Sequence, residues 1–373
     1  MAIEIREVHT KQQLREYIHF PETIYRGDPH WVPPIYADEW SFHNPIKNSA
    51  LQYSATIRLM AYRDGQAVGR VMGIINRKYN EQIGEETARF FNLDCINDQE
   101  AAHALIRQIE SWAKSKRINK VIGPYGFSDK DPQGLQVEGF EYLPVIATPT
   151  NPAYVQTLVE NEGYTKELDC VSYTMAIPKT VPDFLSKISD RVISNKKIRL
   201  LEFNSKRKLK PYIVPVFRLV NECYAPLFGF LPMSEEEMKK FAAQYLPILD
   251  PAFVKVIVDS TNDVIAFVVS MPDMSKGIQK AKGKLFPFGF IHILNSAKKT
   301  KQLDLLLGAV KPNYRGKGLT ALLGQSLMQT ATQRGLETMD SHLILETNKL
   351  MCAECENVGG EIYKRYRVYK KTI

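Results

Sequence analysis

The chain has 373 residues, of which 44% are hydrophobic and 24% charged, and its formal net charge is +8. This length allows two medium-sized domains, each with its own buried core. No apolar run approaches the ~20 residues of a membrane-spanning helix, and the N-terminal stretch lacks the apolar core of a signal peptide, so we expect a cytoplasmic protein without a membrane partner.

The first half predicts a hairpin, a strand, a helix and a further strand. Residues 55–61 and 67–75 are apolar strands that turn at residues 63–65, which read Arg-Asp-Gly. A strand is expected at residues 88–93 and another at residues 120–122. The helix between them has one apolar face, formed by Ala102, Leu105, Ile106, Ile109 and Ala113.

The start of this first helix carries acidic residues and no glycine. Asn97 is the predicted N-cap, with Glu100 closing a capping box. Asp98 and Glu100 would repel a bound diphosphate. We therefore expect no anion site at this helix.

Residues 123–150 form a long segment without a regular period, rich in glycine, proline and aromatic residues. Loops of this length are usually functional or disordered, and the aromatic residues argue against disorder. The segment is expected to pack near the junction between the halves and to wall an acceptor pocket. A strand at residues 168–175 then closes the first half.

The second half repeats the same order. Strands at residues 253–258 and 264–270 form a hairpin, and an insertion at residues 272–299 separates it from an apolar strand at residues 303–310. The following elements are a helix over residues 319–331, a strand over residues 342–346, a helix that starts after Asn348, and an alternating strand over residues 361–369. Asn151 precedes Gly163 by twelve residues, just as Asn348 precedes Gly360. We infer an internal repeat.

The second copy has a glycine-rich turn, Lys311-Pro-Asn-Tyr-Arg-Gly-Lys-Gly-Leu-Thr320, where the first copy has acidic residues. The turn leads directly into a helix, whose N-terminus offers unpaired N–H groups and a partial positive charge. Such a turn can cradle a phosphate. The plainer alternative is an ordinary strand-to-helix loop with solvated cations.

Two phosphate motifs fit this turn poorly. A P-loop requires a serine or threonine after its lysine, whereas Gly318 follows Lys317 here. A dinucleotide fingerprint is formally matched by Gly316, Gly318 and Ala321. Five residues nevertheless separate the strand from the first glycine, and too little chain follows for the remaining βα units.

The turn resembles the coenzyme A pyrophosphate loop of the GNAT acyltransferase superfamily, whose pattern is Gln/Arg-x-x-Gly-x-Gly/Ala. Arg315 and Gly318 match, the preceding Val310–Tyr314 is typical, and Thr320 departs from the final small residue. The acidic counterpart in the first copy, and the segments at residues 25–34 and 123–127, are similar to a bacterial branch of tandem GNAT proteins with one degenerate domain. The resemblance covers nearly the whole chain.

The resemblance implies an α/β (α+β) fold of two tandem GNAT-like domains, each a mixed, mostly antiparallel sheet flanked by helices. Residues 1–178 would form the degenerate domain without a cofactor loop, and residues 179–373 the domain that binds acetyl-CoA or another acyl-CoA. The cofactor-binding residues that follow from it are Val310, Tyr314, Arg315, Gly316, Lys317, Gly318, Leu319, Thr320 and Asn348.

The catalytic groups are less clear from the sequence. Glu346, at the end of a strand beside the cofactor, is the candidate general base or else a cap for the next helix. Many members of the family use a tyrosine on the last helix as the acid, but residues 349–358 contain none. Tyr363 and Tyr366 on the final strand are possible substitutes, or packing residues.

No metal site or nucleic-acid module is predicted. The five cysteines do not form a disulfide framework, and Cys352 and Cys355 make a lone CxxC that is expected to be two buried thiols. Basic clusters are solvated surface unless aromatic residues and a recognised module accompany them. They lie at Lys196–Lys197, Lys206–Lys208, Lys280–Lys284 and Lys298–Lys299.

Two functions remain open at this stage. The first is an N-acyltransferase, most simply an N-acetyltransferase, acting on an amine of a small molecule or peptide. The second is a non-catalytic protein of the same fold that binds acyl-CoA or a small ligand. The identity of the acceptor cannot be derived from one sequence, because fold does not settle function.

Overall fold

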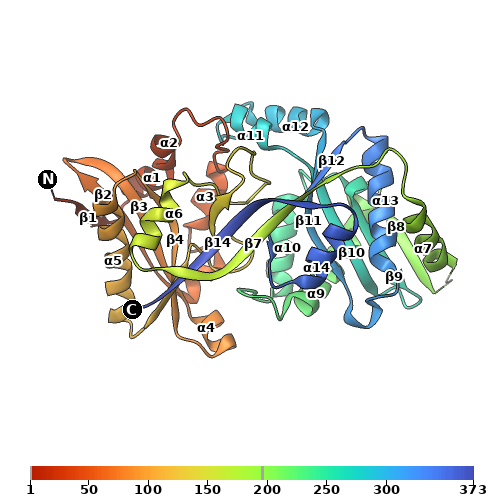
Figure 1. Cartoon of the computed structure of the whole chain (residues 1–373), viewed down its shortest axis with the longest axis horizontal. Coiled ribbons are helices and arrows are strands. Elements are labelled where there is room, and N and C mark those ends of the chain that lie inside the picture. Colours follow the sequence, from red (N-terminus) through yellow and green to blue (C-terminus); the bar gives the residue numbers. More distant parts are fainter. Residues whose placement is uncertain (1, 195–196) are drawn as a thin grey trace.

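The computed structural model describes residues 2–194 and 197–373. Lys196, from the first basic cluster, lies outside these residues. Figure 1 shows two lobes side by side, each a sheet with helices on its faces, and two long strands, β7 and β14, that run across the middle.

The first lobe is built mainly from the first half of the chain. Its elements are β1 (Glu4–Glu7), α1 (Lys11–His19), α2 (Pro21–Ile24), α3 (Tyr36–Phe42), β2 (Ser54–Arg63), β3 (Gln66–Asn76), α4 (Arg77–Ile83), β4 (Thr87–Cys95), α5 (Gln99–Ser115), β5 (Lys120–Gly123), β6 (Leu135–Glu138), α6 (Tyr154–Asn161) and β7 (Thr165–Ala176).

The second lobe continues the chain. Its elements are α7 (Asp183–Ser194), β8 (Ile198–Glu202), α8 (Lys206–Leu209), α9 (Ile213–Tyr224), α10 (Glu235–Tyr245), β9 (Val254–Asp259), β10 (Val264–Pro272), α11 (Ser275–Ala281), α12 (Gly289–Lys299), β11 (Gln302–Val310), α13 (Leu319–Gln333), β12 (Thr338–Ser341), β13 (Ile344–Leu345), α14 (Lys349–Asn357) and β14 (Glu361–Thr372).

All described strands belong to one sheet of 14 strands, whose main path is β1-β2-β3-β4-β5-β14-β7-β12-β11-β10-β9-β8. Neighbours are antiparallel except β4 with β5 and β11 with β12, which are parallel. The predicted class, a mixed and mostly antiparallel sheet flanked by helices, is therefore confirmed.

The last strands of the two copies are exchanged. The C-terminal strand β14 pairs with β5 of the first copy, and β7 pairs with β12 of the second. β14 and β7 also pair with each other and join the two sheets. Residues 1–178 and 179–373 thus each give a strand to the other lobe, which sequence periodicity does not show.

The internal repeat is visible as two matching series of elements. β4, α5, β5, α6 and β7 occur in the same order as β11, α13, β12, α14 and β14. Both hairpins form as expected, and the turn of the first has positive φ at Asp64 and Gly65. The predicted strand at residues 342–346 is wrong in position, because the pairing strand β12 ends at Ser341 and only Ile344–Leu345 pair again.

Candidate functional site

The glycine-rich turn joins β11 to α13. After β11 ends at Val310, a short 3-10 turn spans Pro312–Tyr314, and Gly316 and Gly318 have φ of +72° and +82°. Gly318 is the N-cap of α13 and has no side chain to cap the helix. The first N–H groups of α13 are therefore open to an anionic ligand.

The two glycines have different surroundings. A Cβ on Gly318 would lie 2.7 Å from Cγ2 of Ile188 and 3.0 Å from Cγ2 of Val192, both on α7. A Cβ on Gly316 would meet nothing within 4 Å. The turn is thus pressed against α7 at Gly318 and faces open space at Gly316.

Two exposed cations flank the turn. Nε of Arg315 donates to the carbonyl oxygen of Val310 at 3.3 Å, and Nζ of Lys317 lies 5.1 Å from the centre of the Tyr314 ring. Their charges add to the positive end of the helix dipole. This end of the second lobe is therefore suited to a phosphate or diphosphate.

Thr320, the departure from the family pattern, is exposed in the first turn of α13. Burial raises the pKa of Glu354 on α14, and a hydrogen bond with Thr320 partly offsets this. The threonine hydroxyl thus has a protein partner.

Next to the turn, β11 and β12 separate. They pair in parallel from Gln302 with Thr338 to Leu305 with Ser341, and the N–H of His342 then donates to the carbonyl of Leu305 at 2.8 Å. Beyond this point the two strands are not paired. A wedge opens between them.

A β-bulge lies in β11 at the start of this wedge. Leu307 faces Val269 of β10 and Leu305 faces Ser270, so that Leu306 is an extra residue. A bulge bends its strand and leaves backbone groups without ladder partners. It increases the separation of β11 from β12.

The wedge contains a mostly apolar cavity of about 380 Å³, called here the second cavity. Its walls are the unpaired part of β11, the chain from Ser341 to Leu345, and the inner sides of α9 and α10. The apolar side chains that line it include Ile213, Val216, Val220, Phe241, Leu246, Leu249 and Leu307. Such a space favours an apolar ligand.

Two titratable side chains line the second cavity near β11. The hydroxyl of Tyr224 donates to the carbonyl oxygen of Gly308 at 3.1 Å, and burial raises the pKa of Tyr224 to about 12. Burial lowers the pKa of His342 to about 4, partly offset by a hydrogen bond to the backbone of Ile146. At neutral pH the tyrosine is protonated and the imidazole is uncharged.

The corresponding position of the first copy holds a different cavity, about 580 Å³ in volume, called here the first cavity. It lies where β4 bulges, with φ of +49° at Asn92, and it is lined by the chain from Phe91 to Asp94 and by part of residues 124–135. Its wall includes an ion pair in which Nη2 of Arg70 lies 2.8 Å from Oδ2 of Asp94.

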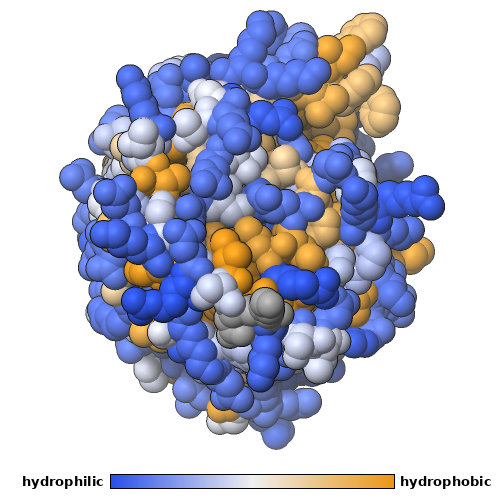
Figure 2. Space-filling model, turned by 90° about the vertical axis from the view of Figure 1, so that its right-hand side faces the viewer, coloured by the Kyte–Doolittle hydropathy of each residue, from blue (hydrophilic) through white to orange (hydrophobic). Residues whose placement is uncertain are grey.

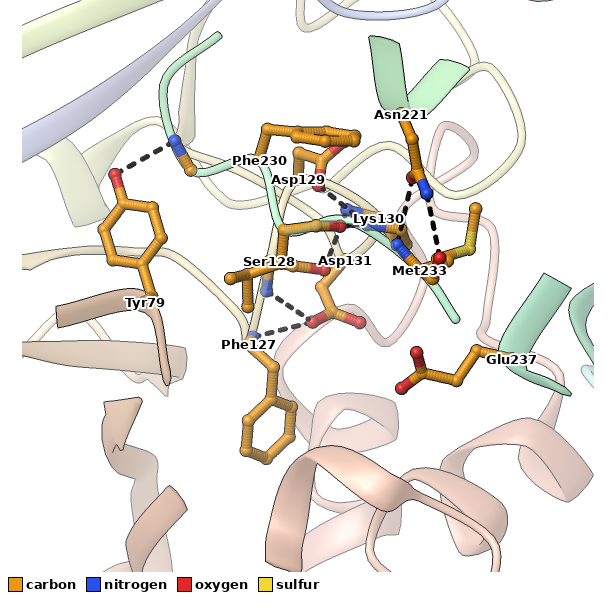
Figure 3. A network of polar contacts seen from close by, with 12 residues as sticks. Tyr79, Phe127, Ser128, Asp129, Lys130, Asp131, Asn221, Phe230, Met233 and Glu237 are labelled. Atoms are coloured by element: carbon orange, nitrogen blue, oxygen red, sulfur yellow. Dashed lines mark hydrogen bonds and ion pairs between the residues drawn. The ribbon is translucent and has the colours of Figure 1, made fainter. Parts of the chain in front are cut away.

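Asp131 is the most perturbed carboxylate in the first cavity. Figure 3 shows its Oδ2 accepting from the N–H groups of Phe127 and Ser128, at 2.6 and 3.2 Å. Protein surrounds the group, and this burial raises its pKa to about 6 despite the two donors. Glu237 turns its carboxylate toward the same space (Figure 3).

Glu237 is held from both sides. Its Oε2 accepts from the N–H of Ser234 at 2.8 Å, and its Oε1 accepts from Oγ of Ser49 at 3.0 Å. Burial alone would raise the pKa of Glu237, but these hydrogen bonds outweigh it and the pKa is lowered. Glu237 is therefore ionised at neutral pH.

Residues 123–150 contribute to the walls of both cavities. Nζ of Lys130 donates to the carbonyl of Leu231 at 2.6 Å, and the hydroxyl of Tyr79 accepts from the N–H of Gly229 at 3.1 Å (Figure 3). Both cavities are lined by Lys130, Ile146, Ala147, Met233, Phe241 and Tyr245. They share one wall, and His342 lies beside it through its contact with Ile146.

None of the three predicted catalytic residues lines either cavity. Glu346 accepts from Nζ of Lys166 at 2.9 Å and from the N–H of Asp169 at 3.0 Å. Burial would raise its pKa, but these contacts lower it overall. Burial raises the pKa of Tyr363 and Tyr366 well above the ordinary value, and both hydroxyls are enclosed in the protein. Their catalytic roles stay predictions.

Asn348 is both an N-cap and a cavity residue. Its side chain accepts from the N–H of Met351 at 3.3 Å at the start of α14, and it also lines the second cavity. The structure thus brings Asn348 to the same cavity as residues 305–308 of β11. The glycine turn follows the end of that strand at Val310.

Sequence reasoning did not select His342, Tyr224 or Asp131. The sequence predicts a strand that begins at His342, and only the structure shows that this residue follows β12. Asp131 lies in the irregular segment that was expected to wall a pocket. Tyr224 ends a helix of ordinary amphipathic pattern, and nothing in the sequence distinguishes it.

One sheet contains two copies of a unit in which parallel strands separate, and a glycine-capped helix lies beside the second wedge. This arrangement defines the chain as a protein of the tandem GNAT fold. Solved structures agree. The match to a tandem GNAT protein from the clavulanic acid biosynthesis pathway has a TM-score of 0.57 at 12% identity and covers 99% of this chain and 98% of that one. A GCN5-related N-acetyltransferase from Sphaerobacter thermophilus matches with a TM-score of 0.54 at 12% identity over 99% and 95% of the two chains.

Two curated proteins are similar along their whole lengths. Protein YghO of Escherichia coli is 29% identical over 99% of this chain and 95% of its own. Bacterial ceramide synthase of Caulobacter vibrioides is 25% identical over 100% of this chain and 98% of its own. No family model matches the chain.

Proposed function

We propose that the chain is an N-acyltransferase that moves an acyl group from acyl-CoA to the amine of a small molecule. The observation that carries this proposal is the second wedge, where an apolar cavity lies along residues 305–308 of β11 and an uncapped helix N-terminus with two cations follows the end of the same strand. A coenzyme A thioester has a matching division into an anionic end and an apolar acyl end.

In this proposal the cofactor residues act in two groups. The N–H groups at Leu319 and Thr320, with Arg315 and Lys317, bind the diphosphate of coenzyme A. The unpaired backbone of β11 near Gly308 holds the pantetheine arm and polarises the thioester carbonyl. The acyl chain extends between α9 and α10.

The acceptor amine is proposed to arrive from the first cavity. The carboxylates of Asp131 and Glu237 attract an ammonium group there, and the shared wall at Ile146 leads to His342. Its neutral imidazole accepts the proton that the amine loses as nitrogen attacks the carbonyl carbon. Tyr224, which is protonated at neutral pH and bonds the backbone of Gly308, is the proposed donor of a proton to the leaving thiolate.

A lipid substrate is favoured over acetyl transfer to a peptide. A ceramide is the amide of a fatty acid and a long-chain amino alcohol, and one curated relative is a ceramide synthase. The apolar lining of the second cavity suits a fatty acyl chain better than an acetyl group, which needs no such space.

The test is release of free thiol from palmitoyl-CoA and from acetyl-CoA in the presence of long-chain amino alcohols and, separately, water-soluble amines. We expect amine-dependent release that is faster with palmitoyl-CoA. Ile213→Trp, which narrows the second cavity, should lower the palmitoyl rate at least about tenfold and the acetyl rate less. Thiol release that does not depend on an amine would contradict acyl transfer. So would the absence of thiol release with every combination of acyl-CoA and amine.

A non-catalytic acyl-CoA-binding protein is the second candidate. The observation that favours it is the placement of Glu346, Tyr363 and Tyr366 outside both cavities. This candidate predicts thermal stabilisation by palmitoyl-CoA without any amine-dependent thiol release. The same two measurements therefore separate the candidates.

A further inference from the structure

The insertion between β10 and β11 carries an unusual apolar surface, called here the α11–α12 face. Five of the thirteen large apolar side chains that are exposed in the described chain lie within residues 286–294. Phe286 and Phe288 are 81% and 66% exposed. The other three, on α12, are Phe290, Ile291 and Leu294. Exposed apolar patches of this kind usually mark interaction sites.

Lysines surround these side chains. Residues 274–303 contain no aspartate or glutamate. The exposed lysines of the face are Lys276, Lys280, Lys282, Lys284, Lys298 and Lys299. In Figure 2 apolar side chains project at the top of the molecule, at the height of α11 and α12 in Figure 1, next to hydrophilic ones. The face is therefore apolar and strongly positive at once.

The protein holds the face rigidly. Ile278 of α11 and Ile293 of α12 are buried in one cluster with apolar residues of the first lobe. The carbonyl of Gly283 accepts from the N–H of Tyr36 at 3.0 Å, and Nε2 of Gln279 donates to the carbonyl of Trp31 at 2.9 Å. With the inner sides packed in this way, exposure of Phe286 and Phe288 is a property of the folded chain.

From this arrangement we propose that the α11–α12 face docks on the surface of a bilayer that contains anionic phospholipids. Exposed aromatic and aliphatic side chains of α12 and of the turn before it enter the headgroup boundary, while lysines beside them pair with lipid phosphates. A protein partner would need acidic groups around an apolar groove, whereas the apolar side chains of this face project from the molecule (Figure 2) and three of the five are phenylalanines. A lipid surface needs only apolar depth and negative charge.

Docking of this kind needs no membrane-spanning helix. In the described residues no helix is long and apolar enough to cross a membrane. The expectation that the protein has no membrane partner rested on the lack of a spanning segment and of a signal peptide, and the α11–α12 face argues against it. Ser275 and Ile278 of α11 also line the first cavity, so a docked face would place that cavity near the lipid surface.

The experiment is co-sedimentation of the whole chain with two kinds of vesicle, one of phosphatidylcholine and one in which about a third of the lipid is phosphatidylglycerol. Neither lipid carries a primary amine, so the proposed acceptor site is not engaged. We expect the wild type to bind the anionic vesicles at least about tenfold more strongly than the neutral ones. Added salt should weaken this binding.

Two variants test the two components of the face. Phe286→Ser with Phe288→Ser, and Lys280→Ala with Lys298→Ala and Lys299→Ala, should each reduce binding at least about tenfold. The matched controls are Ile46→Ser with Leu350→Ser, which remove two other exposed apolar side chains, and Arg207→Ala with Lys208→Ala. The controls should bind as the wild type does.

Three results would overturn the proposal. The first is that the wild type does not sediment with anionic vesicles. The second is that the phenylalanine variant binds as strongly as the wild type. The third is that the control variants lose as much binding as the test variants. The wild type could instead be a dimer that binds no vesicles, with the phenylalanine variant a monomer in light scattering. That result would assign the face to contact with a second copy of the chain. The melting temperature of each variant is compared with that of the wild type, and an unchanged value shows that lost binding is not due to misfolding.

Discussion

The two copies of the fold differ most at the wedge between their parallel strands. In the second copy the wedge is mostly apolar. It adjoins the N-terminus of α13, whose N-cap residue, Gly318, has no side chain to bond the first N–H groups. In the first copy the cavity has more polar groups in its lining, among them Asp131 and an ion pair of Arg70 with Asp94, and the matching helix is capped by Asp98. A duplicated fold can thus keep the same backbone plan and give its two copies different chemistry.

The N-terminus of α5 is capped by a carboxylate, which is the physical reason to expect no anion there. Asp98 accepts from the N–H groups of Glu100 and Ala101, at 3.0 and 3.4 Å. Arg63 forms ion pairs with Asp98 and Glu100. The N-cap predicted from the sequence was Asn97, one residue early, but the consequence is the same because the helix N–H groups are already satisfied.

The largest expected effect is at His342. His342→Ala should lower amine-dependent turnover by about a hundredfold, because general base catalysis is lost, and leave coenzyme A affinity nearly unchanged. Thiol release and calorimetry measure these two quantities. Glu346→Gln and Tyr363→Phe are the matched comparisons, and a larger loss in either would return the catalytic role to the residues that the sequence suggested.

Gly318→Ala should weaken coenzyme A binding by at least about tenfold. The substitution imposes a strained positive φ of +82° and places a Cβ 2.7 Å from Ile188, so the turn must move. Gly316→Ala adds only backbone strain and should have the smaller effect. Equal affinity for both variants and the wild type in calorimetry would mean that the turn is not the phosphate site.

Asp131→Asn tests the polar wedge. With a pKa of about 6, Asp131 is charged at pH 8 and largely protonated at pH 5, so amine turnover of the wild type should fall as the pH drops through 6. The variant should lose most turnover at pH 8 and keep its coenzyme A affinity.

The same substitution should raise stability at high pH. The folded-state pKa of Asp131 lies above the unfolded value of ~3.9, so the buried charge destabilises the fold above pH 6 and less so below. Melting temperatures at pH 8 and pH 5 should therefore show a gain in the variant that shrinks at the lower pH. A gain in melting temperature that is larger at pH 5 than at pH 8 would show that burial does not disfavour the charged form of Asp131.

The smallest expected effect is at Asp98. Asp98→Ala removes a helix cap and should cost about 1 kcal/mol of stability without changing coenzyme A affinity. Chemical denaturation measures the stability, and calorimetry measures the affinity for coenzyme A. A gain of coenzyme A binding at α5 would show that the cap alone distinguishes the copies.

The sequence was sufficient for the repeat and for the glycine turn. Local periods predicted the hairpins and α13, and the contrast between residues 97–100 and 315–320 predicts an anion site at α13. The exchange of β7 and β14 depends on pairing between distant residues and has no local signal. Cavity residues such as Tyr224 and Asp131 gain their roles only when α9 and residues 123–150 pack together.

Hydrogen–deuterium exchange of the chain with and without coenzyme A is the most direct test of the contrast between the two copies. We predict that coenzyme A slows exchange at residues 315–322, where α13 begins, and leaves residues 96–101, where α5 begins, unchanged. Slowed exchange at residues 96–101, or no change at residues 315–322 when coenzyme A is saturating, would contradict it.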